Sequence, residues 1–304
     1  MQRWHILGVG AIGGLFASLL QEAGTRCTLL LRDSDPDLAE GTTCITLRRG
    51  ERLHSYQFEA SASADASPIS HLLVCTKAQD IIPAIAGVAH RLAPDAVVLL
   101  LANGLGYQQQ VRARWPQLDC FSGSTTEGVF REGRRAICHA GRGSTLVGQP
   151  GRETAPGWFD AWLALPIQCG WSRDIDTVLW RKLAINCAIN PLTALHGCPN
   201  GELAQRAELA ALVGELCAEI RAIGIAAGQE QAVSDLQTQV MAVISATANN
   251  RSSMLQDVLA GRETEIDYLT GHLLAQGREH GIEAPRNAAL LAAVKALRAG
   301  TRPA

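Results

Sequence analysis

Residues 3–20 read RWHILGVGAIGGLFASLL, and this stretch decides the fold of the first half of the chain. The apolar run Arg3–Leu7 predicts a short strand, and the apolar residues after Gly13 recur at helical spacing until Gly24. Between strand and helix lies a G-x-G-x-x-G motif, whose first glycine permits a tight turn, whose second lets the backbone approach a pyrophosphate, and whose third lets helix and strand pack closely. Because the free N–H groups of the helix start attract an anion, we favour a dinucleotide site over a glycine-rich turn without a ligand. The residues expected to contact the cofactor are Gly8, Val9, Gly10, Ala11, Ile12 and Gly13.

The end of the second predicted strand, Thr25–Leu31, indicates which dinucleotide binds. An acidic residue at this position would bind the ribose hydroxyls of NAD, but the chain has Arg32, whose guanidinium can pair with the 2′-phosphate of NADP. Asp33 follows immediately, and NAD remains possible if that carboxylate faces the ribose. We favour NADP(H) because the arginine holds the strand-end position itself.

Further along, strands and helices alternate. His71–Cys75 and Ala96–Leu100 are predicted strands, and the helical pattern Gln79–Leu92 separates them, which indicates a parallel sheet covered by helices. Cys44–Leu47 and Leu53–Phe58 predict a small hairpin inserted into this order.

The second half has a different pattern. Short strand-like stretches at 136–139 and 144–147 are followed by a Gly/Pro-rich segment, one helix and one strand, and from Asp174 on almost every residue suits a helix. Helix breaks are expected at Pro191, the CPNGE turn, Gly224, Gly228 and Gly281. We therefore predict an α/β Rossmann-type domain over residues 1–172 and an all-α domain over residues 173–304.

Composition excludes several classes of protein. With 304 residues, 47% apolar residues and a formal net charge of −2, the chain suits a folded protein without a basic surface for nucleic acid or membrane. Nine cysteines in an odd count, without a C-x-x-C pair, indicate reduced buried thiols of a cytoplasmic protein and neither a disulfide framework nor a zinc site. We expect no metal, because the eight histidines lack metal-ligand spacing, and no signal peptide, because the glycine motif begins so early. The sequence leaves open whether the protein is a monomer or a homodimer.

A polar stripe lies in the second half, in the segment WRKLAINCAINP. Lys182, Asn186 and Asn190 are four residues apart and so share one face of a predicted helix that is otherwise apolar. Reduction of a ketone needs a hydride on carbon and a proton on oxygen, and a buried ammonium with a lowered pKa can donate that proton. The amides can hold a carboxylate or hydroxyl of the substrate. The alternative is the exposed stripe of a surface helix, which the apolar neighbours disfavour.

Two later segments could complete this site. NNRSSM over 249–254 places amides and hydroxyls at a helix start, although Ser252 or Ser253 could equally be an ordinary N-cap. Glu265 could pair with the lysine or with substrate, although a glutamate in an acidic helical stretch is usually solvated.

The motifs in combination resemble the ketopantoate reductase (2-dehydropantoate 2-reductase) family over essentially the full length of the chain. They are GVGAIGG, CTKAQD, ANGLG, WRKLAINCAINPLTAL, CPNGEL, NNRSSMLQD and ETEIDYLTG. The resemblance implies a Rossmann domain followed by a helical domain similar to that of 6-phosphogluconate dehydrogenase relatives. It also implies NADPH-dependent reduction of ketopantoate to (R)-pantoate, on the route to pantothenate and coenzyme A.

The resemblance also assigns roles to residues. Lys182 matches the family's proton donor, and Glu265 matches its second essential polar residue, near cofactor and substrate. The cofactor residues that it implies, beyond the glycine loop, are Arg32, Lys77, Asn103, Gly128 and Glu265. The substrate residues that it implies are Asn103, Lys182, Asn186, Asn190, Asn200, Asn250 and Ser253.

The sequence thus favours hydride delivery from NADPH to ketopantoate in a cleft between the domains. A reductase of another branched 2-oxo acid is the nearest alternative, because chains on one scaffold differ in substrate. A non-catalytic NADP(H)-sensing module is a further alternative, which Lys182 disfavours.

Overall fold

The computed structural model of this chain describes residues 2–298 and divides by its contacts into two units. The first unit contains the chain up to Ala102 together with Tyr107–Ile175. The second contains Asn103–Gly106 and the chain from Asp176 on. The segment Asn103–Gly106 therefore makes its contacts with the helical unit, although it follows a strand of the first unit in sequence.

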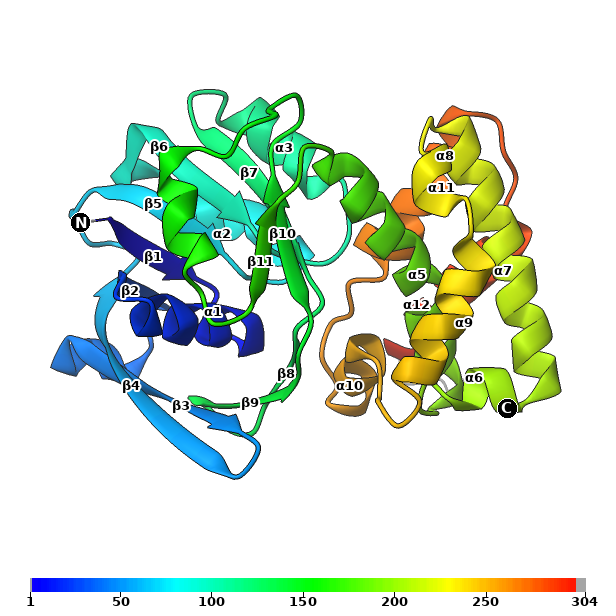
Figure 1. Cartoon of the computed structure of the whole chain (residues 1–304), viewed down its shortest axis with the longest axis horizontal. Coiled ribbons are helices and arrows are strands. Elements are labelled where there is room, and N and C mark those ends of the chain that lie inside the picture. Colours follow the sequence, from blue (N-terminus) through cyan, green and yellow to red (C-terminus); the bar gives the residue numbers. More distant parts are fainter. Residues whose placement is uncertain (1, 299–304) are drawn as a thin grey trace. The chain divides into compact units, whose positions relative to one another are not determined.

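A mixed sheet forms the first unit, and among the described residues it has eleven strands (Figure 1). The strands are β1 (Arg3–Leu7), β2 (Arg26–Leu31), β3 (Thr42–Arg49), β4 (Arg52–Ala62), β5 (Ile69–Val74), β6 (Leu92–Leu100), β7 (Asp119–Thr125), β8 (Gly128–Arg131), β9 (Ala136–Gly141), β10 (Ser144–Gly148) and β11 (Gln168–Trp171). Their order is β11-β10-β7-β6-β5-β1-β2-β4-β3-β9-β8. From β7 to β4 every neighbouring pair is parallel, whereas β3 with β4, β7 with β10 and β8 with β9 are antiparallel. The expected parallel sheet and its inserted β3–β4 hairpin are thus both present.

Helices cover the sheet where the chain crosses between parallel strands. They are α1 (Ala11–Glu22), α2 (Ile81–Val88), α3 (Tyr107–Arg114) and α4 (Asp160–Leu163), with single 3₁₀ turns η1 (Pro36–Glu40), η2 (Ala78–Asp80), η3 (Ala89–Arg91) and η4 (Gly157–Phe159). The helical pattern expected over 79–92 is therefore divided among η2, α2 and η3. The crossings β1-α1-β2 and β5-α2-β6 run in opposite directions along the sheet, so right-handed connections place α1 and α2 on opposite faces.

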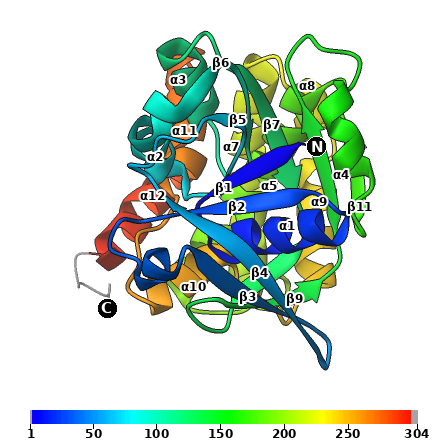
Figure 2. The ribbon, with the colours of Figure 1, turned by 90° about the vertical axis from the view of Figure 1, so that its left-hand side faces the viewer.

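The core of the first unit is aromatic. Trp4 of β1 lies edge-on to Trp162 of α4, with ring centroids 5.5 Å apart, and Phe16 of α1 stacks on the same indole at 5.4 Å. All three side chains are fully buried. Beyond β2 the sheet continues through β4, β3 and β9 around α1, which Figure 2 shows between β2 and the β3–β9 strands.

The sheet topology brings three predicted cofactor residues to one edge. The registers of β2, β1, β5 and β6 align the last residues of these parallel strands. Gly8, Arg32 and Lys77 follow the carboxyl ends of β1, β2 and β5, respectively. Ligands of open α/β sheets bind outside this edge.

Among the described residues, the second unit contains helices joined by loops and no strand. Its elements are α5 (Ile175–His196), α6 (Glu202–Gln205), α7 (Ala207–Ala226), α8 (Glu230–Val233), α9 (Leu236–Ala246), α10 (Ser253–Leu259), a π-helical turn η5 (Asp267–Gly271), α11 (His272–Glu279) and α12 (Pro285–Arg298).

Two of the expected helix breaks are wrong. Helix α5 continues through Pro191 to His196, and α7 continues through Gly224. Ala188 and Leu192 on either side of the proline are fully buried, so tertiary packing outweighs the roughly 3 kcal/mol that an interior proline costs. At Gly224 a Cβ would lie 2.7 Å from Val233 Cγ1, so the glycine permits close packing of α8 on α7.

Candidate active site

The glycine loop of the first unit has the shape of a pyrophosphate cradle. Gly8 has φ +94°, and a Cβ there would lie 2.5 Å from the backbone nitrogen of Thr76. A Cβ at Gly13 would lie 2.2 Å from the carbonyl oxygen of Gly8, which fits the tight packing of helix on strand. At Gly10, by contrast, a Cβ would meet nothing within 4 Å. The second glycine thus faces open space, which a closely approaching ligand can occupy.

The start of α1 is suited to an anion. Gly10 is the N-cap residue, and no side chain caps the helix through a hydrogen bond. The first turn of a helix carries free N–H groups and a partial positive charge. An uncapped helix start behind a glycine loop therefore fits the pyrophosphate of a dinucleotide, as the motif predicts.

The other cofactor candidates of the first unit follow strands of the same sheet. Arg32 is exposed after β2, and within residues 2–298 its guanidinium has no ion-pair partner. Lys77 is half-buried at the start of η2. Gly128 begins β8, where a Cβ would lie 3.1 Å from the backbone nitrogen of Gly141. Asp33 is exposed beside Arg32.

In the second unit, α5 carries the polar stripe. Lys182 and Asn186 are half-buried, and Asn190 is buried. Burial lowers the pKa of Lys182 from 10.5 to about 8, and the nearby carboxylate of Glu265 opposes this shift by favouring the ammonium. The stripe is therefore a partly desolvated amine followed by two amides, and not a solvated surface stripe.

Glu265 precedes the π-helical turn η5 and is half-buried. Asn103 donates a hydrogen bond from Nδ2 to Glu265 Oε2 at 3.2 Å. The backbone of the same segment is tied to η5, because Leu105 N donates to the Tyr268 carbonyl at 2.9 Å. Gly104, at φ +83°, passes so close that a Cβ would lie 2.6 Å from that carbonyl oxygen. The segment Asn103–Gly106 thus brings the amide of Asn103 to the carboxylate of Glu265, which is also the electrostatic partner of Lys182.

The helix start at α10 resolves the two serines. Ser252 Oγ accepts a hydrogen bond from Leu255 N at 3.1 Å, so Ser252 is the N-cap. Thr193 of α5 donates from its buried hydroxyl to Ser252 Oγ at 2.7 Å. Ser253, the first residue of α10, has an exposed side chain that is not used for capping. The N-capping alternative is therefore correct for Ser252 and leaves Ser253 available to a ligand.

Asn200 and Asn250 meet through the backbone. Asn200 N donates to the Asn250 carbonyl at 2.9 Å, and Asn200 Nδ2 donates to Thr247 Oγ1 at 2.8 Å. The other side-chain atom of Asn200, Oδ1, is buried without a hydrogen-bond partner. A buried acceptor without a partner is costly, so a hydroxyl donor from a ligand would suit this position. The side chain of Asn250 is exposed.

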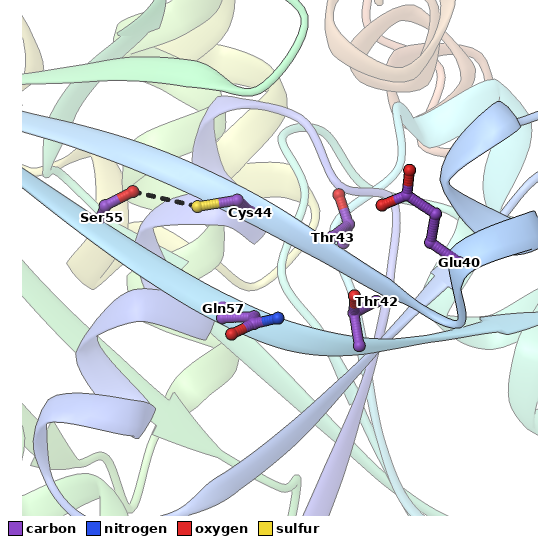
Figure 3. A pocket seen from close by; sticks show the side chains of 6 residues that line it. All are labelled: Glu40, Thr42, Thr43, Cys44, Ser55 and Gln57. Atoms are coloured by element: carbon purple, nitrogen blue, oxygen red, sulfur yellow. Dashed lines mark hydrogen bonds between the residues drawn. The ribbon is translucent and has the colours of Figure 1, made fainter.

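A hollow of about 380 Å³ lies elsewhere in the first unit, against the β3–β4 hairpin (Figure 3). Its lining residues are Glu40, Thr42, Thr43, Cys44, Ser55 and Gln57. Cys44 Sγ lies 3.0 Å from Ser55 Oγ across the hairpin. None of the site residues predicted from the sequence lines this hollow.

Two groups of contacts in the structure are not predicted from the sequence. One is the Thr193–Ser252 hydrogen bond, for which the spacing of Thr193 three residues after Asn190 is a weak signal. The other is a pair of arginines, Arg134 and Arg135, which bind aspartates of the turn after β2. No local pattern shows that second group, because the partners are about 100 residues apart.

The described residues contain neither a metal-ligand cluster nor a helix that could span a membrane. No group of three or more His, Cys, Asp or Glu side chains there could hold a metal ion. Within residues 2–298, no helix combines the length and apolar character that crossing a bilayer requires. The described part of the chain has nine free cysteines, of which Cys44 is exposed.

A glycine loop on a parallel sheet and a half-buried amine beside a carboxylate on a helical unit define a pyridine-nucleotide-dependent oxidoreductase. Comparison with known proteins identifies the family. The model of "Ketopantoate reductase PanE/ApbA" matches residues 4–152, and that of "Ketopantoate reductase PanE/ApbA C terminal" matches residues 174–298. The chain belongs to the ketopantoate reductase family.

Individual relatives agree with this assignment. The 2-dehydropantoate 2-reductase of Shigella flexneri is 36% identical over 299 residues, which are 95% of this chain and 93% of that protein. The structure of a PanE/ApbA family ketopantoate reductase from Ralstonia eutropha JMP134 has a TM-score of 0.86 at 26% identity, covering 98% of this chain and 99% of that one. The resemblance and the Rossmann-plus-helical fold class predicted from the sequence are confirmed.

A more distant likeness concerns the fold alone. The ternary structure of D-mandelate dehydrogenase with NADH and anilino(oxo)acetate has a TM-score of 0.88 at 19% identity, covering 98% of this chain and 99% of that one.

Proposed function

We propose that this chain is a 2-dehydropantoate 2-reductase that uses NADPH to convert ketopantoate to (R)-pantoate, in the route to pantothenate and coenzyme A. Membership of the ketopantoate reductase family supports the substrate, and the exposed Arg32 at the end of β2 supports NADPH over NADH. Nine free cysteines suit a reducing compartment, and we place the protein in the cytoplasm.

The observation that carries the proposal is the half-buried amine of Lys182 beside Glu265. With a pKa of about 8, most Lys182 side chains are protonated near neutral pH, yet the proton is far easier to release than from an ordinary lysine. A dinucleotide held at the glycine loop would supply the hydride that the carbonyl carbon of the substrate needs. The Lys182 ammonium stabilises the negative charge that develops on the carbonyl oxygen and donates its proton to that oxygen.

The remaining polar residues position the reactants. Asn186, Asn190 and Ser253 bind the carboxylate and hydroxyl of the oxo acid, and the unpartnered oxygen of Asn200 accepts from the substrate hydroxyl. Glu265 keeps the Lys182 amine protonated between turnovers, and Asn103 orients the Glu265 carboxylate. Asn250 would contribute through its exposed amide. Correct orientation of this kind lowers the barrier by restricting the reacting groups.

On the cofactor side, the glycine loop Gly8–Gly13 holds the pyrophosphate at the start of α1. Arg32 pairs with the 2′-phosphate, and Lys77 and Gly128 contact the cofactor farther along the same edge of the sheet. Asn103 and Glu265 would contact cofactor as well as substrate.

The test compares kcat/KM for NADPH oxidation over a panel of 2-oxo acids that differ in branching and in the presence of the terminal hydroxyl. We expect ketopantoate to exceed its dehydroxylated analogue 3,3-dimethyl-2-oxobutanoate by 10²-fold or more, on the order of what an unpaired buried polar group costs in discrimination. Equal kcat/KM values for the two acids would indicate a 2-oxo acid reductase with broad substrate specificity. If no acid is reduced in a single turnover despite bound NADPH, the chain would be a cofactor-binding module and the proposal would fail.

A further inference from the structure

The turn that follows β2 is fixed by its own backbone and by two carboxylates. Asp35 N donates to the Arg32 carbonyl at 2.8 Å, which closes a turn that begins at the predicted 2′-phosphate arginine. Asp35 Oδ1 then accepts from Asp37 N at 3.1 Å and caps η1. Arg32 is therefore one end of a short segment whose geometry depends on Asp35.

Two arginines from the turn between β8 and β9 bind these carboxylates. Arg135 donates from Nη2 to Asp35 Oδ2 at 2.6 Å and from Nε to Asp37 Oδ2 at 3.3 Å. Arg134 binds the same two aspartates. The Arg135 side chain is only 17% exposed, whereas that of Arg134 is 52% exposed. Arg135 is therefore the anchored member of the pair, because partial burial lessens solvent screening.

Strand β3 holds Arg135 in place through two of its residues. Thr43 of β3, which Figure 3 shows beside the hollow, donates from its hydroxyl to Asp37 Oδ2 at 2.5 Å and accepts from Arg135 Nε at 3.3 Å. Thr46 N donates to the Arg135 carbonyl at 2.9 Å. The Thr43 hydroxyl, and after it the Arg135 guanidinium, lower the pKa of Asp37, so this carboxylate stays ionised.

Strand β9, which begins directly after Arg135, also contacts α1, the helix that follows the glycine loop. Ile137 lies two residues after Arg135 in β9, and a Cβ at Gly14 of α1 would lie 3.2 Å from its Cδ1. Strand β9 thus contacts the first turns of the helix that begins at the glycine loop and, through Arg135, the turn that begins at Arg32.

We propose that Arg135 is a positioning residue for recognition of the cofactor's 2′-phosphate. It holds Asp35 and Asp37 in the turn after β2, so that these carboxylates are not free to pair with Arg32 and the Arg32 guanidinium remains directed to solvent and to an incoming phosphate. The inference rests on the NADP(H) preference of the proposed function, and it extends the phosphate site to a residue about 100 positions away in sequence.

The experiment is a calorimetric titration of the full chain with adenosine 2′,5′-bisphosphate and, separately, with AMP, which lacks the 2′-phosphate. In Arg135→Ala we expect the bisphosphate to bind about tenfold more weakly, as loss of one charge-assisted contact would give, with AMP changed less than about twofold. The matched control is Arg48→Ala, which removes an arginine that binds Glu132 on the same β8–β9 turn without reaching the aspartates. It should change neither affinity.

A second variant separates positioning from simple charge. Asp35→Ala removes a negative charge near the phosphate, so an effect of charge alone would tighten binding of the bisphosphate. Positioning predicts the opposite, because the turn loses both its cap and its anchor to Arg135. AMP affinity close to that of the parent shows that each variant is folded.

The outcomes are distinguishable. If Arg135→Ala weakens the bisphosphate and AMP equally, or Asp35→Ala tightens the bisphosphate, the positioning role is overturned while the proposed function stands. If the parent chain itself does not prefer the bisphosphate to AMP, the NADPH part of the proposed function fails, and this inference fails with it.

Discussion

Lys182 is one of only three lysines in the chain, and its surroundings distinguish it from Lys295. Lys295 pairs with Asp267 at a site where both side chains are about half exposed, at 47% and 52%. Lys182 instead lies on α5 where burial lowers its pKa to about 8. Burial destabilises the charged form of a lysine, and lysines found in such surroundings are candidate catalytic residues.

The first prediction concerns the pH dependence of ketone reduction. Lys182 must be protonated to donate, so kcat/KM should be constant below the pKa of about 8 and fall tenfold per pH unit above it. Oxidation of pantoate, the reverse reaction, should rise through the same pH range because it needs the neutral amine. Initial rates across this range, in both directions, check the prediction.

Glu265→Gln provides the control for that profile. Because Glu265 raises the pKa of Lys182, its removal should move the descending limb to lower pH. If the descending part of the kcat/KM profile stays at the same pH in Glu265→Gln, the observed titration belongs to a group other than Lys182.

The second prediction concerns the stability cost of the same amine. Replacement of Lys182 by Met should raise the free energy of unfolding near neutral pH by about 1–2 kcal/mol. The lowered pKa means that the folded state disfavours the charged amine, and partial exposure to solvent keeps this effect small. Below pH 8 both folded and unfolded states carry the proton, so the cost is fully present there. As pH rises from about 8 to 10.5 the folded state loses the proton first, and the advantage of the variant should shrink.

Denaturant unfolding of parent and variant over this pH range measures the difference. A Met variant that is less stable than the parent at neutral pH would show that the Lys182 ammonium is well solvated or strongly paired in the folded state.

At the scale of elements, the spacing of Lys182, Asn186 and Asn190 correctly predicts that they share one helix. Local rules fail at the next residue, Pro191, which we expect from its sequence to end the helix. The proline removes one N–H donor, but burial of its neighbours on α5 decides the outcome. Sequence patterns report local preference, whereas helix boundaries in a packed unit depend on tertiary contacts.

The third prediction compares two glycines of α7. Gly224→Ala would place a Cβ 2.7 Å from Val233 Cγ1, and we expect a loss of about 1–3 kcal/mol of stability from overpacking. At Gly214 the nearest contact for a Cβ is Gln237 Nε2, at 3.5 Å, so Gly214→Ala should instead stabilise by about 0.5–1 kcal/mol through helix propensity. Thermal or denaturant unfolding of the two variants should give opposite signs, and equal effects would contradict the packing assigned to α8 on α7.

Over the whole molecule, the sequence predicts the Rossmann-plus-helical fold class because the glycine motif, the strand–helix alternation and the helical second half are local patterns. It does not predict that β9 pairs with β3, or that Asn103–Gly106 contacts η5, because such pairings join residues far apart in sequence. The glycine loop, Arg32 and the Lys182 stripe follow from residue chemistry. Asn200, Lys77 and Gly128 come from family resemblance alone, since an isolated amide, lysine or glycine carries no pattern.

The fourth prediction concerns linkage between cofactor and folding. A ligand that binds only the folded chain raises its stability, by about 2.7 kcal/mol at a hundred times its Kd. NADP⁺ should therefore raise the unfolding midpoint more than NAD⁺ at equal concentration, and Arg32→Ala should abolish the difference. A larger shift with NAD⁺ would instead assign the end of β2, through Asp33, to ribose recognition.

The central claim is that the Lys182 ammonium delivers the proton to the reduced carbonyl. The most direct measurement is the kcat for ketopantoate reduction by Lys182→Ala with NADPH affinity measured in parallel, and with Lys295→Ala as the control for loss of a lysine. We expect a fall in kcat of about 10²–10⁴-fold, unchanged NADPH binding and parental turnover in the control. A Lys182→Ala enzyme that reduces ketopantoate at the parental rate would contradict it.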